Sequence, residues 1–123
     1  MHVGRIMRTE PITLPPDTSI VKARDIIAEK KIAHLLIVDK KDQLVGIVSD
    51  RDLKQSWASP ATTLSAHELN YILKQLTLET IMRTKIITVT PGTTIERAAN
   101  IMQENRISAL PVVDNDKLIC IIT

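Results

Sequence analysis

Residues 34–53 read HLLIVDKKDQLVGIVSDRDL, which is two short apolar runs separated by a polar turn and followed by a Ser-Asp-Arg-Asp sequence. Continuous apolar runs of this length, at residues 35–38 and 44–48, are typical of strands buried on both faces or of a hairpin packed under helices. Ser49 is a candidate N-cap for a following helix, and Asp52 is a favourable acid in its first turn. The stretch therefore predicts two strands and then a helix.

The same pattern occurs a second time further along the chain. The sequence IMRT stands at residues 6–9 and again at residues 81–84. The matched segments share the same order of apolar positions, and a one-residue deletion near Lys41 restores their alignment. The matched pairs are residues 6–9 with 81–84, 12–39 with 87–114, and 44–49 with 118–123. An ordered series of matches of this kind indicates an internal duplication.

Each copy predicts the order strand, helix, strand, strand, helix. In the first copy, residues 12–14 form a short extended segment that two prolines stop, because proline supplies no amide to a sheet ladder. A helix with apolar residues along one face follows, with Thr18 or Ser19 as its N-cap. The second copy repeats this pattern with Thr93 or Thr94 as the N-cap.

A connection of about 25 residues separates the two copies. Residues 59–63 are loop-like, and Ser65 with Glu68 forms a capping box that predicts a helix as far as about Leu76. An apolar stripe on this helix predicts packing against the core or a partner, and its members are Leu69, Ile72, Leu73 and Leu76. Because each copy has too few apolar residues to fold alone, the copies and their connection are predicted to form one module.

Composition and charge exclude several classes of protein. The 123 residues are 44% hydrophobic and 24% charged, which is the balance of a globular protein. A net charge of +2 and 2% aromatic residues argue against a nucleic-acid surface. No signal-peptide pattern is found, and no apolar run reaches the roughly 20 residues of a membrane span. The single cysteine, Cys120, lies in an apolar run and predicts a reducing, cytoplasmic location. Arg8, Arg83, Lys85 and Lys117 are interpreted as solvated surface charge rather than a polyanion-binding patch.

Catalytic patterns are absent from the sequence. The three glycines are isolated, so there is no glycine-rich phosphate loop, and the spacing suggests no Ser-His-Asp, Cys-His or paired-acid grouping. His34 lies at the edge of an apolar run with no second His or Cys at ligand spacing. This favours structural packing or a weak phosphate contact over metal binding. The sequence therefore predicts neither an enzyme nor a metal site.

The order of these motifs resembles that of the CBS motif. The first copy carries it as IMRT, HLLIVD and LVGIVSDRDL, and the second as IMRT and RISALPVVD. Together they are similar to a CBS-domain pair, or Bateman module, over essentially the whole chain, and look most like the bacterial acetoin-utilisation type. The resemblance implies an α/β (α+β) fold of two β-α-β-β-α repeats related by a pseudo-twofold axis. Its expected divisions are residues 1–58 for the first repeat, 59–79 for a linker with a helix, and 80–123 for a second repeat that lacks its final helix.

The resemblance also implies a regulatory sensor that needs no cofactor and binds AMP, ADP, ATP or S-adenosylmethionine. In this family a Ser or Thr after the third strand contacts phosphate, and an Asp three residues later holds the ribose hydroxyls. Carried onto this sequence, these residues are Ser49 and Asp52, and a helix N-terminus beside them favours an anionic phosphate. Arg51 and Arg106 are expected to neutralise further phosphates. The second copy is expected to complete this ligand site with Ile86, Ile87, Thr88, Ile107, Ser108 and Ala109.

A second, pseudo-symmetric site is expected to bind poorly or not at all. Its residues would be Ile12, Thr13, Ile32, Ala33, His34 and Thr123. Its ribose-binding Asp would lie three residues after Thr123, past the end of the sequence. Either the chain is truncated or this site is degenerate.

The resemblance finally implies partners and leaves alternative functions. A homodimer formed through the helices is expected, as is an effector domain or protein outside this chain. One alternative is a ligand-free structural or dimerisation module that uses the apolar stripe between residues 69 and 76. Another is an enzyme, for example a nucleotide hydrolase.

Overall fold

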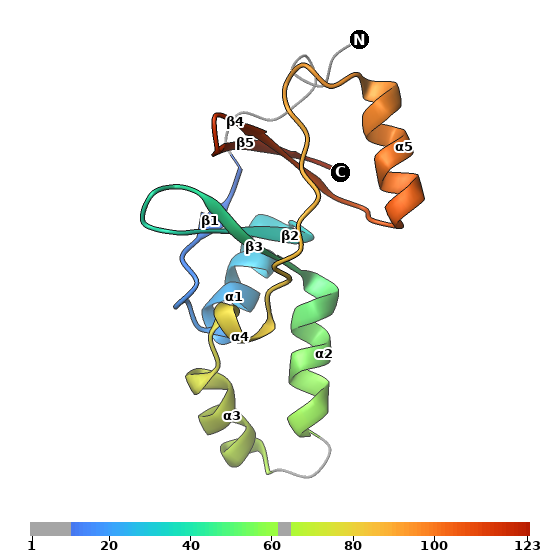
Figure 1. The fold of residues 1–123 in the computed structure, drawn as a ribbon. Helices are drawn as coiled ribbons and strands as arrows, with labels where there is room; N and C mark the ends of the chain where they lie inside the picture. The colour runs from blue at the N-terminus through green and yellow to red at the C-terminus, as the bar shows by residue number, and fades with distance from the viewer. Residues whose placement is uncertain (1–10, 62–64) are drawn as a thin grey trace.

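The computed structural model describes residues 11–61 and 65–123, and it consists of two stacked halves (Figure 1). The elements of the first half are β1 (Thr13–Leu14), α1 (Ile20–Lys30), β2 (His34–Val38), β3 (Leu44–Ser49), α2 (Asp50–Ala61), α3 (Ala66–Gln75) and α4 (Leu78–Ile81). The elements of the second half are α5 (Ile95–Asn105), β4 (Leu110–Asp114) and β5 (Lys117–Ile122). The motif copy at residues 6–9, which contains Arg8, lies outside the described residues.

The first sheet has the strand order β1-β2-β3. β1 is parallel to β2, and β2 is antiparallel to β3, with His34 opposite Ser49. The turn between β2 and β3 is held by the side chain of Asp39, which accepts hydrogen bonds from the amides of Lys41 at 2.8 Å and Gln43 at 3.0 Å. Of the two arrangements that the apolar runs allow, the structure shows the hairpin packed under helices.

Backbone geometry repeats at the positions that the duplication aligns. Lys31 and Arg106 end α1 and α5 in the same left-handed conformation, each with φ 54°. The strand register also shifts at the same place in both hairpins, after Ile37 in β2 and after Val112 in β4. This agreement, with the mixed helix and strand content, confirms the predicted tandem-repeat fold.

The second half departs from the predicted repeat in its first strand. An extended segment was expected at residues 87–89, the counterpart of residues 12–14, but the structure has a single parallel bridge there, between Val89 and Val112. The amide of Val89 donates to the carbonyl of Pro111 at 3.1 Å, and its own carbonyl accepts from the amide of Val113 at 2.8 Å. The last element, β5, ends one residue before Thr123.

Pro111 accounts for the reduced pairing. Its counterpart in the first half, Leu36, donates its amide to the carbonyl of Ile12 at 3.4 Å. Because proline has no amide hydrogen, the equivalent bond to Ile87 cannot form in the second half. The duplication aligns apolar positions, and Pro111 fits that apolar pattern while it removes a backbone donor.

The helix N-caps are where the sequence places them. Ser19, rather than Thr18, caps α1 by accepting a hydrogen bond from the amide of Lys22 at 3.2 Å. Thr94 caps α5 in the same way, from the amide of Arg97 at 3.1 Å. The choice follows from backbone geometry, because only the residue directly before the helix has extended dihedrals with its oxygen in reach of the third amide.

Helices α2 and α3 differ in how well their ends were predicted. α3 begins after Ser65, whose hydroxyl accepts from the amide of Glu68 at 3.2 Å, and it ends at Gln75 as predicted. α2 runs as far as Ala61 and so extends into a segment predicted as loop. Pro60 lies one residue before the helix ends, where its missing amide costs a single hydrogen bond.

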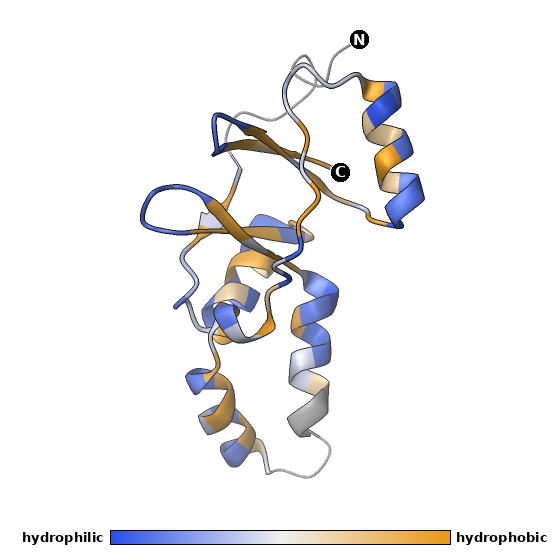
Figure 2. Cartoon of the chain, in the orientation of Figure 1, coloured by the Kyte–Doolittle hydropathy of each residue, from blue (hydrophilic) through white to orange (hydrophobic). Residues whose placement is uncertain are grey.

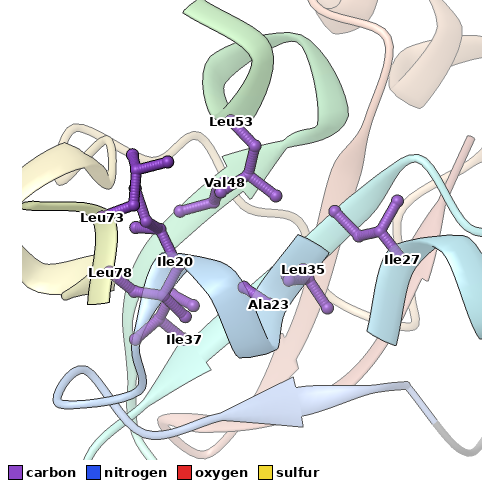
Figure 3. Packing of buried hydrophobic residues seen from close by; sticks show 9 residues of the cluster. All are labelled: Ile20, Ala23, Ile27, Leu35, Ile37, Val48, Leu53, Leu73 and Leu78. Atoms are coloured by element: carbon purple, nitrogen blue, oxygen red, sulfur yellow. The ribbon is translucent and has the colours of Figure 1, made fainter. Parts of the chain in front are cut away.

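The larger hydrophobic cluster lies between the first sheet and its helices (Figure 3). Its buried members are Ile20, Ala23, Ile27, Leu35, Ile37, Val48, Leu53, Leu73 and Leu78. Leu73 comes from α3 and Leu78 from α4, a short helix that was not predicted. The amide of Ile20 also donates to the carbonyl of Leu76 at 3.0 Å. The connection between the copies is therefore built into the core of the first half.

Three of the four residues in the predicted stripe pack in this core. Leu73 is buried, and Leu69 and Leu76 are partly buried against the cluster. Ile72 does not follow them, because it is 36% exposed on the outer side of α3 beside Tyr71, which is 65% exposed. Core packing is confirmed for the three leucines, whereas Ile72 lies outside the core and its packing against a partner stays a prediction.

The second hydrophobic cluster is smaller and lies between α5 and the β4–β5 hairpin. Its buried members are Val89, Ala98, Leu110, Val112 and Cys120. Figure 2 shows hydrophobic strands in both halves, and a helix α5 on which hydrophilic and hydrophobic residues alternate. Across residues 11–61 and 65–123, no helix has the length and apolar content to cross a membrane.

Gly46 marks a close approach between β3 and the chain that leaves α4. A Cβ atom at this position would lie 2.8 Å from Cγ of Met82 and closer still to its Sδ. At Gly92 the nearest atom to an added Cβ would be Oγ1 of Thr90, at 3.9 Å. Met82 therefore packs on the strand at a place where only glycine leaves room for it.

Replacing Gly46 with alanine is expected to lower the free energy of unfolding by about 1–3 kcal/mol, because the added methyl group overpacks the contact with Met82. Urea unfolding measures the change. Gly92→Ala is the matched control and is expected to leave the stability within about 1 kcal/mol of the original or to raise it. Equal stabilities of the two variants would show that Met82 does not constrain this position.

Candidate functional site

Ser49 and Asp52 form a reciprocal hydrogen-bonded pair at the start of α2. The amide of Asp52 donates to Oγ of Ser49 at 3.0 Å, and the amide of Ser49 donates to Oδ2 of Asp52 at 3.1 Å. This is a capping box, in which both side chains satisfy amides that the helix leaves open. It fixes the serine hydroxyl and the carboxylate at the junction of β3 and α2.

Arg83 reaches this pair from the chain between the two halves. Its amide donates to the carbonyl of Ile47 at 3.0 Å, and its carbonyl accepts from the amide of Ile47 at 3.1 Å. These two bonds extend the first sheet by one residue at the free edge of β3. The guanidinium then lies 3.2 Å from Oδ1 of Asp52, through Nη2.

The pKa of Asp52 lies below its ordinary value of 3.8. Burial is the largest single influence and raises the pKa, because it disfavours the carboxylate. The hydrogen bonds from the backbone and side chain of Ser49, together with the bond and the charge of Arg83, lower the pKa and outweigh burial. Asp52 is therefore held as a carboxylate by groups from both halves.

His34 joins the halves on the other side of the site. Its Nε2 lies 3.3 Å from Oγ of Ser108, which precedes β4. Burial lowers the pKa of His34, and the negative charge of Asp52 acts in the opposite direction and raises it. Its Nδ1 is buried and has no hydrogen-bond partner within the described part of the chain. The neutral imidazole is thus the favoured form, as burial disfavours the charged one.

These side chains border a cavity of about 480 Å³ at the junction of the halves. Small-molecule sites commonly have volumes of about 300–1,000 Å³. The junction of β3 and α2 lines it with Ser49, Asp52 and their neighbours, and the second half adds the polar Arg106 and Ser108 together with apolar residues. The apolar residues from the second half are Ile86, Ile87, Ile107, Ala109 and Pro111.

The structure brings most of the predicted ligand site to this cavity. The lining residues that were predicted are Ser49, Arg51, Asp52, Ile86, Ile87, Arg106, Ile107, Ser108 and Ala109. Thr88 was predicted with them and does not line the cavity. That these residues bind a ligand stays a prediction.

The residues assigned to the second site separate into two groups. Ala33 and His34 line the cavity just described, because the start of β2 lies opposite Ser49 in the sheet register. The others, Ile12, Thr13, Ile32 and Thr123, do not line it. The function of this second group stays a prediction.

Sequence reasoning missed two cations of the cavity, Arg83 and Lys85. They were interpreted as solvated surface charge, and both are exposed, but they line the cavity, and Arg83 pairs with Asp52. That interpretation is therefore incomplete. The signal for Arg83 was present in the sequence, because IMRT is the longest identical stretch that the two copies share. Asp50, Ile47 and Pro111 also line the cavity and were not predicted.

No group of three or more His, Cys, Asp or Glu residues that could hold a metal ion occurs in residues 11–61 and 65–123. Cys120 is buried in the second cluster, away from these polar groups.

Comparison with known protein families gives the same assignment over most of the chain. The family model described as CBS domain matches residues 3–58 and residues 78–123. The chain belongs to the CBS-domain family. The first match ends within α2, and the second begins with α4 and takes in the whole second half, so the protein is a CBS-domain pair.

Solved structures of other CBS proteins have the same fold. The acetoin utilization protein AcuB from Vibrio cholerae is 31% identical with a TM-score of 0.85, and the match covers 100% of this chain and 84% of that one. The CBS domain pair of protein MJ0100, in complex with 5′-methylthioadenosine and S-adenosyl-L-methionine, is 30% identical with a TM-score of 0.84, covering 100% and 89%. CBSX2 in complex with AMP is 30% identical with a TM-score of 0.81, covering 99% and 89%.

A curated relative of this CBS pair is an enzyme of much greater length. Inosine-5′-monophosphate dehydrogenase of Nitrosopumilus maritimus (strain SCM1) is 31% identical over 116 residues, which are 94% of this chain and 21% of the enzyme. The chain thus spans about a fifth of that protein.

Replacing Asp52 with asparagine is expected to lower the free energy of unfolding by about 1 kcal/mol at pH 7, because a charged acceptor is lost. The pKa of folded Asp52 is depressed below 3.8, so its carboxylate stabilises the fold above the pKa of the unfolded chain. This contribution is lost as the pH falls through the folded pKa. Urea unfolding at pH 7 and near pH 3 measures it, and the difference between the two proteins should shrink at the lower pH. A difference that is the same at both pH values would contradict the role of the charge.

Proposed function

We propose that this CBS pair binds an adenosine-containing ligand in the cavity between its halves and acts as a regulatory module rather than as an enzyme. The candidate ligands are AMP, ADP, ATP and S-adenosylmethionine. One observation carries the proposal: the hydrogen-bonded Ser49–Asp52 pair lines the same cavity as a group of apolar residues from the other half. Such a cavity offers polar groups to a sugar phosphate and apolar groups to a planar base.

The polar groups of the cavity have the chemistry that a nucleotide needs. The hydroxyl of Ser49 accepts from the amide of Asp52 and keeps its own proton, which it can donate to a phosphate oxygen. The carboxylate of Asp52 is an acceptor with two oxygens, which suits a pair of vicinal ribose hydroxyls. Arg51 and Arg106 border the same cavity and supply charge for phosphate.

The apolar groups of the cavity suit the base. Ile86 and Ile107 come from different segments of the second half and both line the cavity. Branched side chains at these positions can clamp a planar ring from two sides while burying apolar area, which stabilises the complex. Backbone groups beside Ser108 and Ala109 can then bond the edge of the base.

Relatives with bound ligands support the same class of compound. The CBS pair of MJ0100 is in complex with 5′-methylthioadenosine and S-adenosyl-L-methionine, and CBSX2 is in complex with AMP. All three compounds carry an adenosyl group. The apolar residues and the Asp52 carboxylate are the parts of this cavity that suit that shared group.

Regulation would follow from the position of the cavity. Its walls come from both halves, so a ligand that binds one arrangement of the halves more tightly shifts the population toward it. We propose that the shift is passed on to a second copy of the chain in a homodimer, or to an effector domain or protein. The buried Cys120 suits a reducing, cytoplasmic setting.

A ligand-free structural or dimerisation module is the second candidate. Tyr71, 65% exposed, and Ile72, 36% exposed, give α3 an outer apolar surface that favours it. The rest of the predicted stripe is used inside the first half, where Leu73 is buried. The cavity therefore offers more specific chemistry than this surface does.

Replacing Asp52 with alanine is expected to weaken binding of AMP by about 1–3 kcal/mol, because the ribose loses a charged acceptor. Isothermal titration calorimetry with a panel of adenosine compounds measures the affinities. Asp25→Ala is the matched control, since it removes the same charge from an exposed position on α1 outside the cavity. Equal affinities for AMP in the wild type and Asp52→Ala would contradict the site.

Thermal unfolding separates the two candidate functions. A ligand at 100 times its dissociation constant should stabilise the fold by about 2.7 kcal/mol and raise its Tm. The absence of any shift with AMP, ADP, ATP, 5′-methylthioadenosine and S-adenosylmethionine would favour the structural module. Formation of product from ATP under the same conditions would instead identify an enzyme.

A further inference from the structure

We infer that Arg83 makes this site selective for adenosine ligands that carry a phosphate, by exchanging its ion pair with Asp52 for one with that phosphate. The inference rests on the proposed function and adds the charge of the ligand to it. Without ligand, Arg83 occupies the carboxylate that the ribose needs. A phosphate draws the guanidinium away and leaves the carboxylate open to the sugar.

Asp52 is the fixed member of this ion pair. Its side chain is 12% exposed, and its Oδ2 accepts from the amide of Ser49 at 3.1 Å. Its other oxygen, Oδ1, lies 3.2 Å from Nη2 of Arg83. Ribose hydroxyls must therefore compete with Arg83 at Oδ1, while the bond to Ser49 keeps the carboxylate in place.

Arg83 is the member that can move. Its backbone is held to β3 by the two hydrogen bonds with Ile47, so its Cα stays at the rim of the cavity. Its side chain is 70% exposed, and rotation about side-chain bonds is enough to change its partner. The pair is exposed at its Arg83 end, where water screens the guanidinium charge, so a phosphate in the cavity can replace Asp52 as its partner.

The other charges around the cavity favour an anion as the replacement. Arg51, Lys85 and Arg106 line the cavity, and no carboxylate within the described ranges lies within 4.0 Å of their charged groups. The second acid of the cavity, Asp50, pairs with Lys54 at 3.0 Å. A phosphate therefore enters a field of unmatched positive charge, whereas the sulfonium of S-adenosylmethionine meets like charge.

Ligands of different charge should then differ in a defined way. Adenosine breaks the Arg83–Asp52 ion pair and has no anionic group that could replace Asp52 as the partner of Arg83. AMP breaks the same pair and supplies a stronger, bidentate acceptor. S-adenosylmethionine breaks it and adds a positive charge. The order of affinity expected from these contacts is AMP, then adenosine, then S-adenosylmethionine.

The test is calorimetry of the full chain with adenosine, AMP and S-adenosylmethionine, for the wild type, Arg83→Gln and Arg97→Gln. In Arg83→Gln, the affinity for AMP should fall about tenfold, since a charged hydrogen bond is lost. Its affinity for adenosine should rise by up to about fivefold, since a competitor for Asp52 is removed. Arg97→Gln, which removes an exposed cation of α5 outside the cavity, should change neither affinity.

Two results, one for Arg83→Gln and one for the wild type, would overturn the inference and leave the proposed function intact. One is an unchanged ratio between the AMP and adenosine affinities, whether or not both fall together. The other is a wild type that binds S-adenosylmethionine more tightly than AMP. A wild type that binds none of the three compounds would overturn the proposed function itself.

Titration of the wild type at low and high salt gives a check without any substitution, because the preference for AMP over adenosine should decrease as salt screens the phosphate contacts.

Discussion

The pairing of Arg83 with Ile47 is the constraint on which the arrangement of the two halves depends. Two backbone hydrogen bonds hold this residue on the free edge of β3, and six residues later Val89 pairs with Val112 of β4. The chain between the halves is thus fixed to both sheets. In Figure 1 it runs as an extended segment from α4 past both hairpins to α5. The cavity exists because this segment brings Ile86 and Ile87 in front of the start of α2.

The elements that could be predicted from the sequence are those that local chemistry determines. A short polar side chain before a helix, such as Ser19 or Thr94, begins it through a bond to an amide three residues away. The β2–β3 hairpin follows from two apolar runs around a turn that Asp39 closes. The loss of regular strand pairing before β4 could not be predicted in this way. Pro111 preserves the hydrophobic pattern but removes a backbone amide donor, and only the sheet register shows that this amide would have paired with Ile87.

The candidate site also contains features that local sequence determines and features that only the folded structure reveals. The family resemblance supplied Ser49 and Asp52, and their mutual hydrogen bonds follow from a spacing of three residues at a helix start. The partnership of Asp52 with Arg83 joins residues 31 positions apart, so no local pattern reports it. The position of His34 at this cavity was not predicted for a similar reason, since only the strand register sets it opposite Ser49 and within reach of Ser108. Contacts between residues far apart in the sequence therefore could not be predicted from it.

The unequal cores of the two halves affect how the molecule opens. Among residues 11–61 and 65–123, nine buried residues form the cluster under the first sheet and five form the cluster under the second. With less apolar burial, the backbone amides of the β4–β5 hairpin are expected to exchange with solvent sooner than those of the β2–β3 hairpin, through local openings smaller than global unfolding. Ile107 and Ala109, which border the cavity, lie directly before that hairpin. A molecule bound in the cavity would slow amide exchange most in the second half. Occupancy of the cavity would thereby determine how often the second half opens locally.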